Sequence, residues 1–281
     1  MALMLNAGLD FGGIGISALE RFRQILRGRL GYDSLAYRTG AAVYGSFAIA
    51  KREGVLAAWR LNAMAKGPRG QIAELNFSNL RHPIFARVGT PDIATIVNNV
   101  VREEYGAFEP EIAPQFMIDA GAYIGDSSAY FASKFPRLSI VALEPHPDNH
   151  KLASRNLAPY GERVTLLDKA LASTSRPLRI AGDHDGAAIG PEGAAVEATT
   201  IPMIMSLAGR DRVDILKMDI EGSEGDVLNE TADDWLSQVG LLIVEFHGKD
   251  IEAKVMNTLR RNGFEARRHR SLWYCRPIAV T

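Results

Sequence analysis

The chain has 281 residues, of which 47% are hydrophobic and 23% are charged, with a formal net charge of −1. This composition is typical of an ordinary globular protein, and we expect no nucleic-acid partner. The single cysteine, Cys275, excludes an internal disulfide and agrees with a cytoplasmic location. We expect no signal peptide, and no apolar run reaches the roughly 20 residues that a transmembrane helix needs.

The first 80 residues differ in charge from the rest of the chain. They carry ten Lys or Arg and five Asp or Glu, whereas the remaining residues carry 22 and 28. Residues 14–30 place apolar side chains on one helical stripe, and residues 41–65 are also predicted to be helical. We therefore predict a helical appendage over residues 1–80 and a main domain over residues 81–281. The appendage either packs on the main domain or on a second subunit, or it docks on another enzyme or, through residues 14–30, on an anionic membrane.

The segment after the appendage predicts a short strand over residues 82–88 and then a helix. Thr90 has the side chain of an N-cap residue, and Pro91 suits the first helical position. We expect this helix to run to about Tyr105 and to end near Gly106.

From Phe116 onward, short apolar runs alternate with helical patterns, which predicts a parallel sheet covered on both faces. The predicted strands are 116–119, 138–143, 163–168, 213–218 and 240–246, and the predicted helices are 126–134, 147–157, 222–230 and 249–262. Residues 264–268 and 271–280 predict an antiparallel hairpin at the sheet edge. Residues 170–205 predict an irregular excursion with short strands.

An acid and two glycines follow the first of these strands, in the sequence FMIDAGAYIGDSS. Gly121 and Gly125 allow a sharp turn and a close approach to a ligand, because glycine has no Cβ. Asp119 would repel a phosphate, which binds best to backbone N–H groups at a helix start. The turn therefore favours a ligand with a cationic end, such as an amino acid that carries a sulfonium.

The second strand ends in Glu144, an acid that can accept hydrogen bonds from both hydroxyls of a ribose or can cap the following helix. A nicotinamide cofactor needs a G-x-G-x-x-G turn, which this chain lacks, so the pattern favours S-adenosylmethionine. Lys169 and Ala170 follow the third strand, where an adenine could lie, although a plain exit from the strand explains them equally well.

A second polar cluster spans VDILKMDIEGSEGDVL and the later segment LLIVEFHG. Lys217, Asp219 and Glu221 recur at a spacing of two, so they share one direction, as do Glu245 and His247. In a parallel sheet both sets lie at the C-terminal edge, beside the glycine turn.

Methyl transfer to a hydroxyl requires a base or a metal ion near the acceptor. His247 is a candidate base because its ordinary pKa is near neutral, Asp219 or Glu221 could act if desolvated, and Lys217 could hold a carboxylate or steady developing charge. The alternative is a structural ion-pair network. A divalent metal bound by Asp219, Glu221, Glu245 and His247 is not favoured, because the sequence contains no compact metal-ligand motif.

Residues 87–247 resemble the FkbM family of S-adenosylmethionine-dependent methyltransferases. The matching pieces are RVGTPDIATIVNNVVREEYGAF, FMIDAGAYIGDSS, VALEPHPDN, DKALAS, ATTIPMIMS, VDILKMDIEGSEGDVL and IVEFHG. The resemblance implies a class I, Rossmann-like α/β fold with a seven-stranded, mostly parallel sheet. It also implies O-methylation of a small-molecule or glycan acceptor, namely a sugar, polysaccharide or polyketide-type product. Methylation of nitrogen or carbon, or a non-catalytic scaffold role, stays open.

The resemblance also implies roles for particular residues. The acceptor would be bordered by Lys217, Asp219, Glu221 and His247. The cofactor would be held by Asp119, Gly121, Tyr123, Gly125, Ser128, Glu144, Pro145, Lys169, Ala170 and Asp219. The upstream residues that would close over it are Arg87, Thr90, Asp92 and Tyr105. Tyr123 is a departure, because related proteins often have asparagine there.

Overall fold

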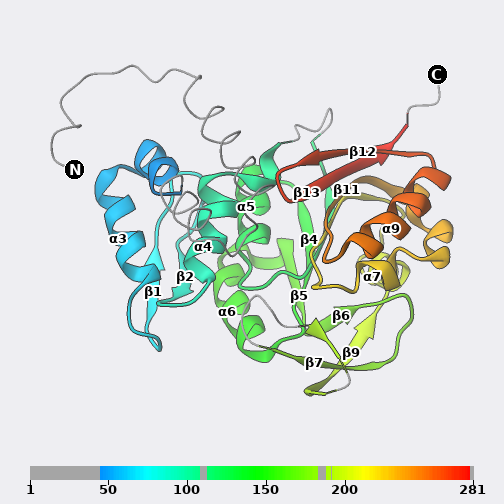
Figure 1. Cartoon of the computed structure of the whole chain (residues 1–281), viewed down its shortest axis with the longest axis horizontal. Helices are drawn as coiled ribbons and strands as arrows, with labels where there is room; N and C mark the ends of the chain where they lie inside the picture. Colours follow the sequence, from blue (N-terminus) through cyan, green and yellow to red (C-terminus); the bar gives the residue numbers. More distant parts are fainter. Residues whose placement is uncertain (1–44, 108–112, 183–187, 191, 279–281) are drawn as a thin grey trace. The chain divides into compact units, whose positions relative to one another are not determined.

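The computed structural model describes residues 45–107, 113–182, 188–190 and 192–278 (Figure 1). The chain divides into two compact units, Met1–Asn62 and Ala63–Thr281. In the first unit residues 45–53 are helical, and α3 (Val55–Ala65) begins after Gly54, whose φ of 92° interrupts the helix predicted over 41–65. The helix predicted over 14–30 lies outside the described residues. The domain boundary predicted between residues 80 and 81 stays a prediction.

Within the described part of the second unit, seven strands form one sheet in the order β12-β13-β11-β10-β3-β4-β5 (Figure 1). The parallel strands are β3 (Phe116–Ala120), β4 (Ser139–Leu143), β5 (Val164–Leu167), β10 (Val213–Met218) and β11 (Val239–Glu245). β12 (Phe264–His269) and β13 (Leu272–Pro277) form the antiparallel edge. The predicted mostly parallel sheet with an edge hairpin is therefore confirmed.

Helices cover both faces of this sheet, as the apolar strands require (Figure 1). α5 (Asp126–Lys134) and α6 (Pro147–Leu157) pack on the face that carries Met117, Ile140 and Ile215. α7 (Ile201–Leu207) and α9 (Lys249–Arg261) pack on the opposite face, together with η5 (Glu230–Asp234) and η6 (Leu236–Gln238). Because side chains alternate along a strand, Asp119 and Lys217 lie on the same face as Met117 and Ile215.

Two smaller sheets flank the main one within the described residues. β1 (Ile72–Leu75) pairs with β2 (Ile84–Arg87). Residues 169–199 form the second small sheet, in the order β6 (Lys169–Leu171), β9 (Ala194–Thr199), β7 (Pro177–Ala181) and β8 (Ala188–Ile189). The second small sheet occupies most of the predicted irregular excursion, and α7 completes it.

The helical segment after β2 is shorter than predicted. α4 (Asp92–Ile96) continues into the π-helix η1 (Val97–Val101), and Tyr105 lies in a separate turn, η2 (Glu104–Gly106). Glu103 separates them because its backbone is left-handed, with φ of 49°. The expected end near Gly106 is thus wrong for the helix proper. The helix predicted over 222–230 is also shorter, as α8 (Glu224–Val227).

None of the helices in the described ranges has both the length and the apolar character needed to cross a membrane.

Gly121, directly after β3, lies close to the backbone of Asp219, directly after β10. Its φ is 79°, and a Cβ at this position would overlap the carbonyl oxygen of Asp219. We expect Gly121→Ala to lower the free energy of unfolding by about 3 kcal/mol, since backbone must move as well as adopt a strained angle. Gly209→Ala is the matched control, because Gly209 has φ of 60° but open space around it. It should cost only about 1 kcal/mol. Equal losses in urea denaturation would contradict the close approach.

Candidate functional site

The C-terminal ends of β3, β10 and β11 lie side by side. The strand register pairs Asp119 with Lys217, and Met218 with Val244. The residues that follow these strand ends therefore meet at one edge of the sheet. This edge is where open α/β sheets bind ligands.

Lys217 and Asp119 form a buried ion pair at this edge. Lys217 Nζ lies 3.3 Å from Asp119 Oδ1, and the two side chains are 3% and 0% exposed. The ammonium also donates to the carbonyl oxygens of Ala120 and Gly121. Burial alone lowers the pKa of Lys217, but the carboxylates of Asp119 and Asp219 outweigh it and raise the pKa. Lys217 therefore stays charged, and it binds β3 and the turn that follows.

The other oxygen of Asp119 anchors the start of α5. Asp119 Oδ2 accepts hydrogen bonds from the hydroxyls of Ser127 and Ser128, each at 2.6 Å. Asp126 beside them accepts from Asn99 Nδ2 at 2.8 Å, and burial raises the pKa of Asp126 to about 6. The side chains of Asp119 and Ser128 are thus buried and hydrogen-bonded within the protein. Their contact with a cofactor stays a prediction.

Glu144 closes the glycine turn from the β4 side. Its side chain accepts from the backbone N–H of Tyr123 at 2.8 Å and of His146 at 2.9 Å. Glu144 is 5% exposed, and this burial raises its pKa to about 7. Asn149 also hydrogen-bonds to this carboxylate. Two oxygens have four lone pairs in all, so the three bonds leave one that can accept from a ribose hydroxyl. Pro145 follows directly.

Tyr123 joins the glycine turn to the upstream segment. It has a left-handed backbone with φ of 52°, a conformation that asparagine also adopts readily. Its hydroxyl donates to the buried Asp92, which also accepts from the Arg87 guanidinium at 2.9 Å. Arg87 in turn donates to Asn149 of α6. Although burial alone raises the pKa of Asp92, the hydrogen bonds from Arg87 and Tyr123 lower it overall.

Two further residues of the upstream segment have different surroundings. Thr90 donates to the carbonyl oxygen of Arg87 and accepts from the N–H of Asp92. The ring of Tyr105 lies 5.9 Å from Lys217 Nζ, and burial, together with the negative charge of Asp219, raises the pKa of its phenol. Tyr105 is thus adjacent to the ion pair.

His247 is surrounded by carboxylates. Its Nδ1 lies 2.9 Å from Glu224 Oε1, and its Nε2 lies 3.7 Å from Asp219 Oδ1 and 3.5 Å from Glu221 Oε2. Burial by itself lowers the pKa of His247, but the bond to Glu224 and the charges of Asp219 and Glu221 raise it to about 9. At neutral pH the imidazole is therefore protonated. An imidazolium has no lone pair to accept a proton. The ordinary, near-neutral pKa of histidine is therefore no longer an argument for His247 as the base.

Glu245 adds a further carboxylate to this edge. Its pKa is raised to about 7 by burial and by the negative charges of Asp219 and Glu104. Glu104 accepts from the hydroxyl of Ser271 at 3.1 Å, so the tip of the β12–β13 hairpin lies against this edge.

The remaining predicted cofactor residues, Gly125, Lys169 and Ala170, make packing or ion-pair contacts with other residues of the protein. Gly125 has φ of 83°, and a Cβ there would press on Leu157. Lys169 lies 2.8 Å from Glu197 across β6 and β9, and Ala170 is buried beside it. Their contact with an adenine stays a prediction.

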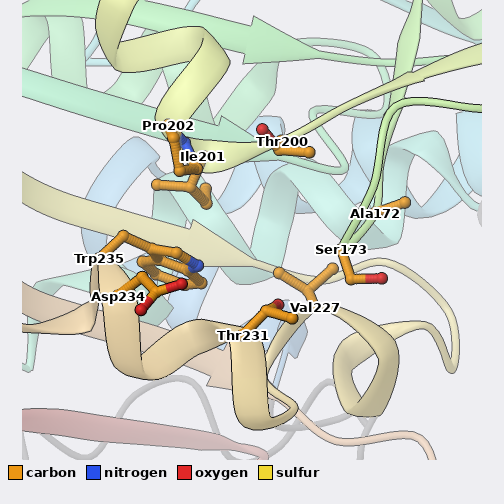
Figure 2. Close-up of a pocket in the computed structure, with 9 residues that line it drawn as sticks. All are labelled: Ala172, Ser173, Thr200, Ile201, Pro202, Val227, Thr231, Asp234 and Trp235. Atoms are coloured by element: carbon orange, nitrogen blue, oxygen red, sulfur yellow. The ribbon is translucent and has the colours of Figure 1, made fainter.

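A separate cavity of about 160 Å³ opens near α7 (Figure 2). It is lined by Ala172, Ser173, Thr200, Ile201, Pro202, Val227, Thr231, Asp234 and Trp235. None of these described residues belongs to the predicted site, and the cavity carries no cluster of charged groups. The charged side chains of the candidate site lie instead at the carboxyl edge of the sheet.

The sequence did not identify Glu224 as a site residue. It is 0% exposed, and it holds His247 from the turn after β10. The local pattern, E-G-S-E, shows only an acid at a helix start, which usually complements the helix dipole. The contact with His247, 23 residues later, depends on β10 and β11 being neighbours.

Three comparisons relate the chain to known proteins. The sequence profile described as the methyltransferase FkbM domain matches residues 119–266. The methyltransferase sdnD of Sordaria araneosa is 28% identical over 198 residues, which cover 56% of this chain and 76% of that protein. The AMB antimetabolite synthetase AmbE of Pseudomonas aeruginosa is 25% identical over 53% of this chain, a stretch that spans only 9% of the synthetase. A solved methyltransferase structure from Geobacter sulfurreducens covers 66% of this chain and 88% of its own, at 20% identity and a TM-score of 0.38.

The raised pKa of Glu144 predicts a pH effect on stability. Between its unfolded pKa of 4.5 and its folded pKa of about 7, the folded protein holds a proton that the unfolded chain releases. Stability should therefore fall as pH rises through this window. From about pH 5 to about pH 8, wild-type protein should lose about 2 kcal/mol more than Glu144→Gln in urea denaturation. Glu162→Gln, at an exposed position, should follow the wild type. Parallel curves for all three proteins would refute the shift.

Proposed function

The chain belongs to the FkbM methyltransferase family, and on that premise we propose that it transfers the methyl group of S-adenosylmethionine to a hydroxyl oxygen. The acceptor is a sugar, a polysaccharide or a polyketide-type product. The observation that carries the proposal is the meeting of the Asp119–Gly121 turn with Asp219, Glu221 and His247 at one edge of the sheet.

The chemistry of the groups at this edge is compatible with S-adenosylmethionine. Asp219, and Asp126 and Glu144 when they are ionised, supply negative charge beyond the Lys217–Asp119 pair. Negative charge suits an ammonium and a sulfonium and would repel a pyrophosphate. Gly121 lets the turn lie against the backbone of Asp219, which brings the end of β10 next to the turn. Glu144 is the residue that would hold the ribose hydroxyls. The turn that Asp119 and Lys217 hold in place would face the methionine end.

The reaction is an in-line displacement. S-adenosylmethionine supplies a methyl group on a positively charged sulfur. The acceptor oxygen forms the new C–O bond while the C–S bond breaks, and its electron pair stays on sulfur as a neutral thioether. The hydroxyl proton must leave the acceptor oxygen. The chain's residues therefore have to orient the hydroxyl and receive that proton.

The carboxylates of Asp219 and Glu221 are the groups that we propose for receiving the proton. They lie at the edge beside the turn, and each is about one-third exposed or less, so an acceptor can reach them. His247, as an imidazolium, would stabilise the negative charge that develops on the acceptor oxygen. Lys217 Nζ is held by Asp119 and the turn carbonyls, and it lies 4.0 Å from Asp219 Oδ2, so its positive charge would act on the acceptor through that carboxylate.

We predict that correctly folded protein binds S-adenosylmethionine and not NAD in isothermal titration calorimetry. Glu144→Gln should weaken the binding of S-adenosylmethionine by at least about tenfold, since charged hydrogen bonds to the ribose are lost. The exposed control Glu162→Gln should bind like wild type.

Mass spectrometry across sugar and polyketide hydroxyls should then detect the mass gain of one methyl group. Binding of neither cofactor would refute the proposal, and a methylated nitrogen or carbon would refute the choice of oxygen.

We also predict that His247→Ala lowers kcat by at least about tenfold while the Kd for S-adenosylmethionine changes by less than about twofold. The reason is that His247 lies among the acceptor-side carboxylates and away from Glu144. His150→Ala on α6 is the matched control and should leave kcat unchanged. Single-turnover rates and calorimetry on the same samples give both quantities. Wild-type turnover by His247→Ala would remove the imidazole from the chemistry.

A further inference from the structure

We propose that Asp219, Glu221 and His247 form a binding site for a hard divalent cation such as Mg²⁺ or Mn²⁺. One ligand atom from each residue lies within 4.8 Å of the other two. Nε2 of His247 is 3.5 Å from Glu221 and 3.7 Å from Asp219. A cation about 2.1 Å from each ligand atom holds neighbouring ligand atoms about 3 Å apart, so small side-chain shifts would complete the site. The sequence did not favour a metal, because these residues are scattered along the chain.

The orientation of His247 is the second observation that points to a metal. Glu224 is 0% exposed, and its Oε1 accepts from His247 Nδ1 and from the backbone N–H groups of Ile220 and Gly222. A carboxylate can only accept, so Nδ1 carries a proton. Nε2 faces the two carboxylates, and a cation that binds there displaces the second proton of the imidazolium. A carboxylate that fixes one ring nitrogen while the other faces the cation is the usual arrangement around metal-binding histidines.

The ligands are held by rigid elements and leave room for other groups. Asp219 follows β10 directly, and His247 follows β11, its parallel neighbour. The three side chains are about one-third exposed or less, so they are accessible from solvent. Two carboxylates and one imidazole suit a hard cation, and they leave further coordination positions for water and for oxygen atoms of an acceptor.

The role of the cation rests on the proposed function, and the bound cation stabilises the developing negative charge in place of the His247 imidazolium. A hydroxyl that binds to a divalent cation loses its proton more readily, and the cation fixes the position of the oxygen. The site therefore selects an acceptor that offers two neighbouring oxygens, such as a vicinal diol of a sugar. The ion-pair alternative, with a protonated His247 between the two carboxylates, needs no cation and makes the opposite prediction for metal binding.

The test uses Mn²⁺ as the probe and the full chain, freed of metal by chelation and dialysis. Electron paramagnetic resonance of free Mn²⁺ should show one ion bound per wild-type chain. Asp219→Asn and Glu221→Gln should each weaken Mn²⁺ binding by at least about tenfold, and Glu224→Gln by about 10-fold to 100-fold. Asp250→Asn, an exposed acid close in sequence, should bind like wild type. Thermal unfolding checks that each variant is folded. If Glu224→Gln does not fold, Asp219→Asn and Glu221→Gln are sufficient for the test, because their side chains are partly exposed.

Wild-type protein that binds no Mn²⁺, or an affinity that Asp219→Asn and Glu221→Gln leave unchanged, overturns the cation site. Calorimetry with S-adenosylmethionine on the same preparations separates this result from the proposed function. Protein that binds S-adenosylmethionine but no Mn²⁺ refutes the cation alone. Protein that binds Mn²⁺ at these residues but not S-adenosylmethionine supports the cation and refutes the methyl donor.

Discussion

The ion pair between Lys217 and Asp119 is the constraint on which the rest of the site depends. Both charges are buried, and a buried charge is costly unless its partner and its hydrogen bonds are in place. The pair also fixes the register of β10 against β3. A shift of one residue would turn Lys217 toward the apolar face covered by α7 and α9, where the described residues offer a hydrophobic core.

From this pair, contacts extend in two directions. Asp119 binds the hydroxyls of Ser127 and Ser128, which sets the start of α5. Lys217 binds the carbonyls of Ala120 and Gly121, which sets the turn where we propose the methionine end of the cofactor. The pair is thus a support for the cofactor side. The acceptor side has its own support in Glu224, which holds His247.

Local patterns in the sequence predicted most elements of the methyltransferase domain. The bounds of α5, α6 and β10 agree with the predictions, because each has a clear apolar period and a turn residue at its end. The predictions were wrong where tertiary contacts or backbone angles override the local pattern. The helix after Pro91 ends early because Glu103 adopts a left-handed conformation. Short strands were expected within residues 170–205, but their pairing into one sheet was not, because the pairing depends on tertiary contacts.

The sequence by itself determined the family, the alternation of strands and helices, and the acid–glycine turn, because these depend on residues that are close along the chain. Only the tertiary structure decided the partners of the charged side chains. Lys217 binds Asp119 because β3 and β10 are neighbours, Tyr123 binds Asp92 across 31 residues, and Glu224 holds His247 because β10 adjoins β11. Strand order brings these groups together, and no local spacing records it.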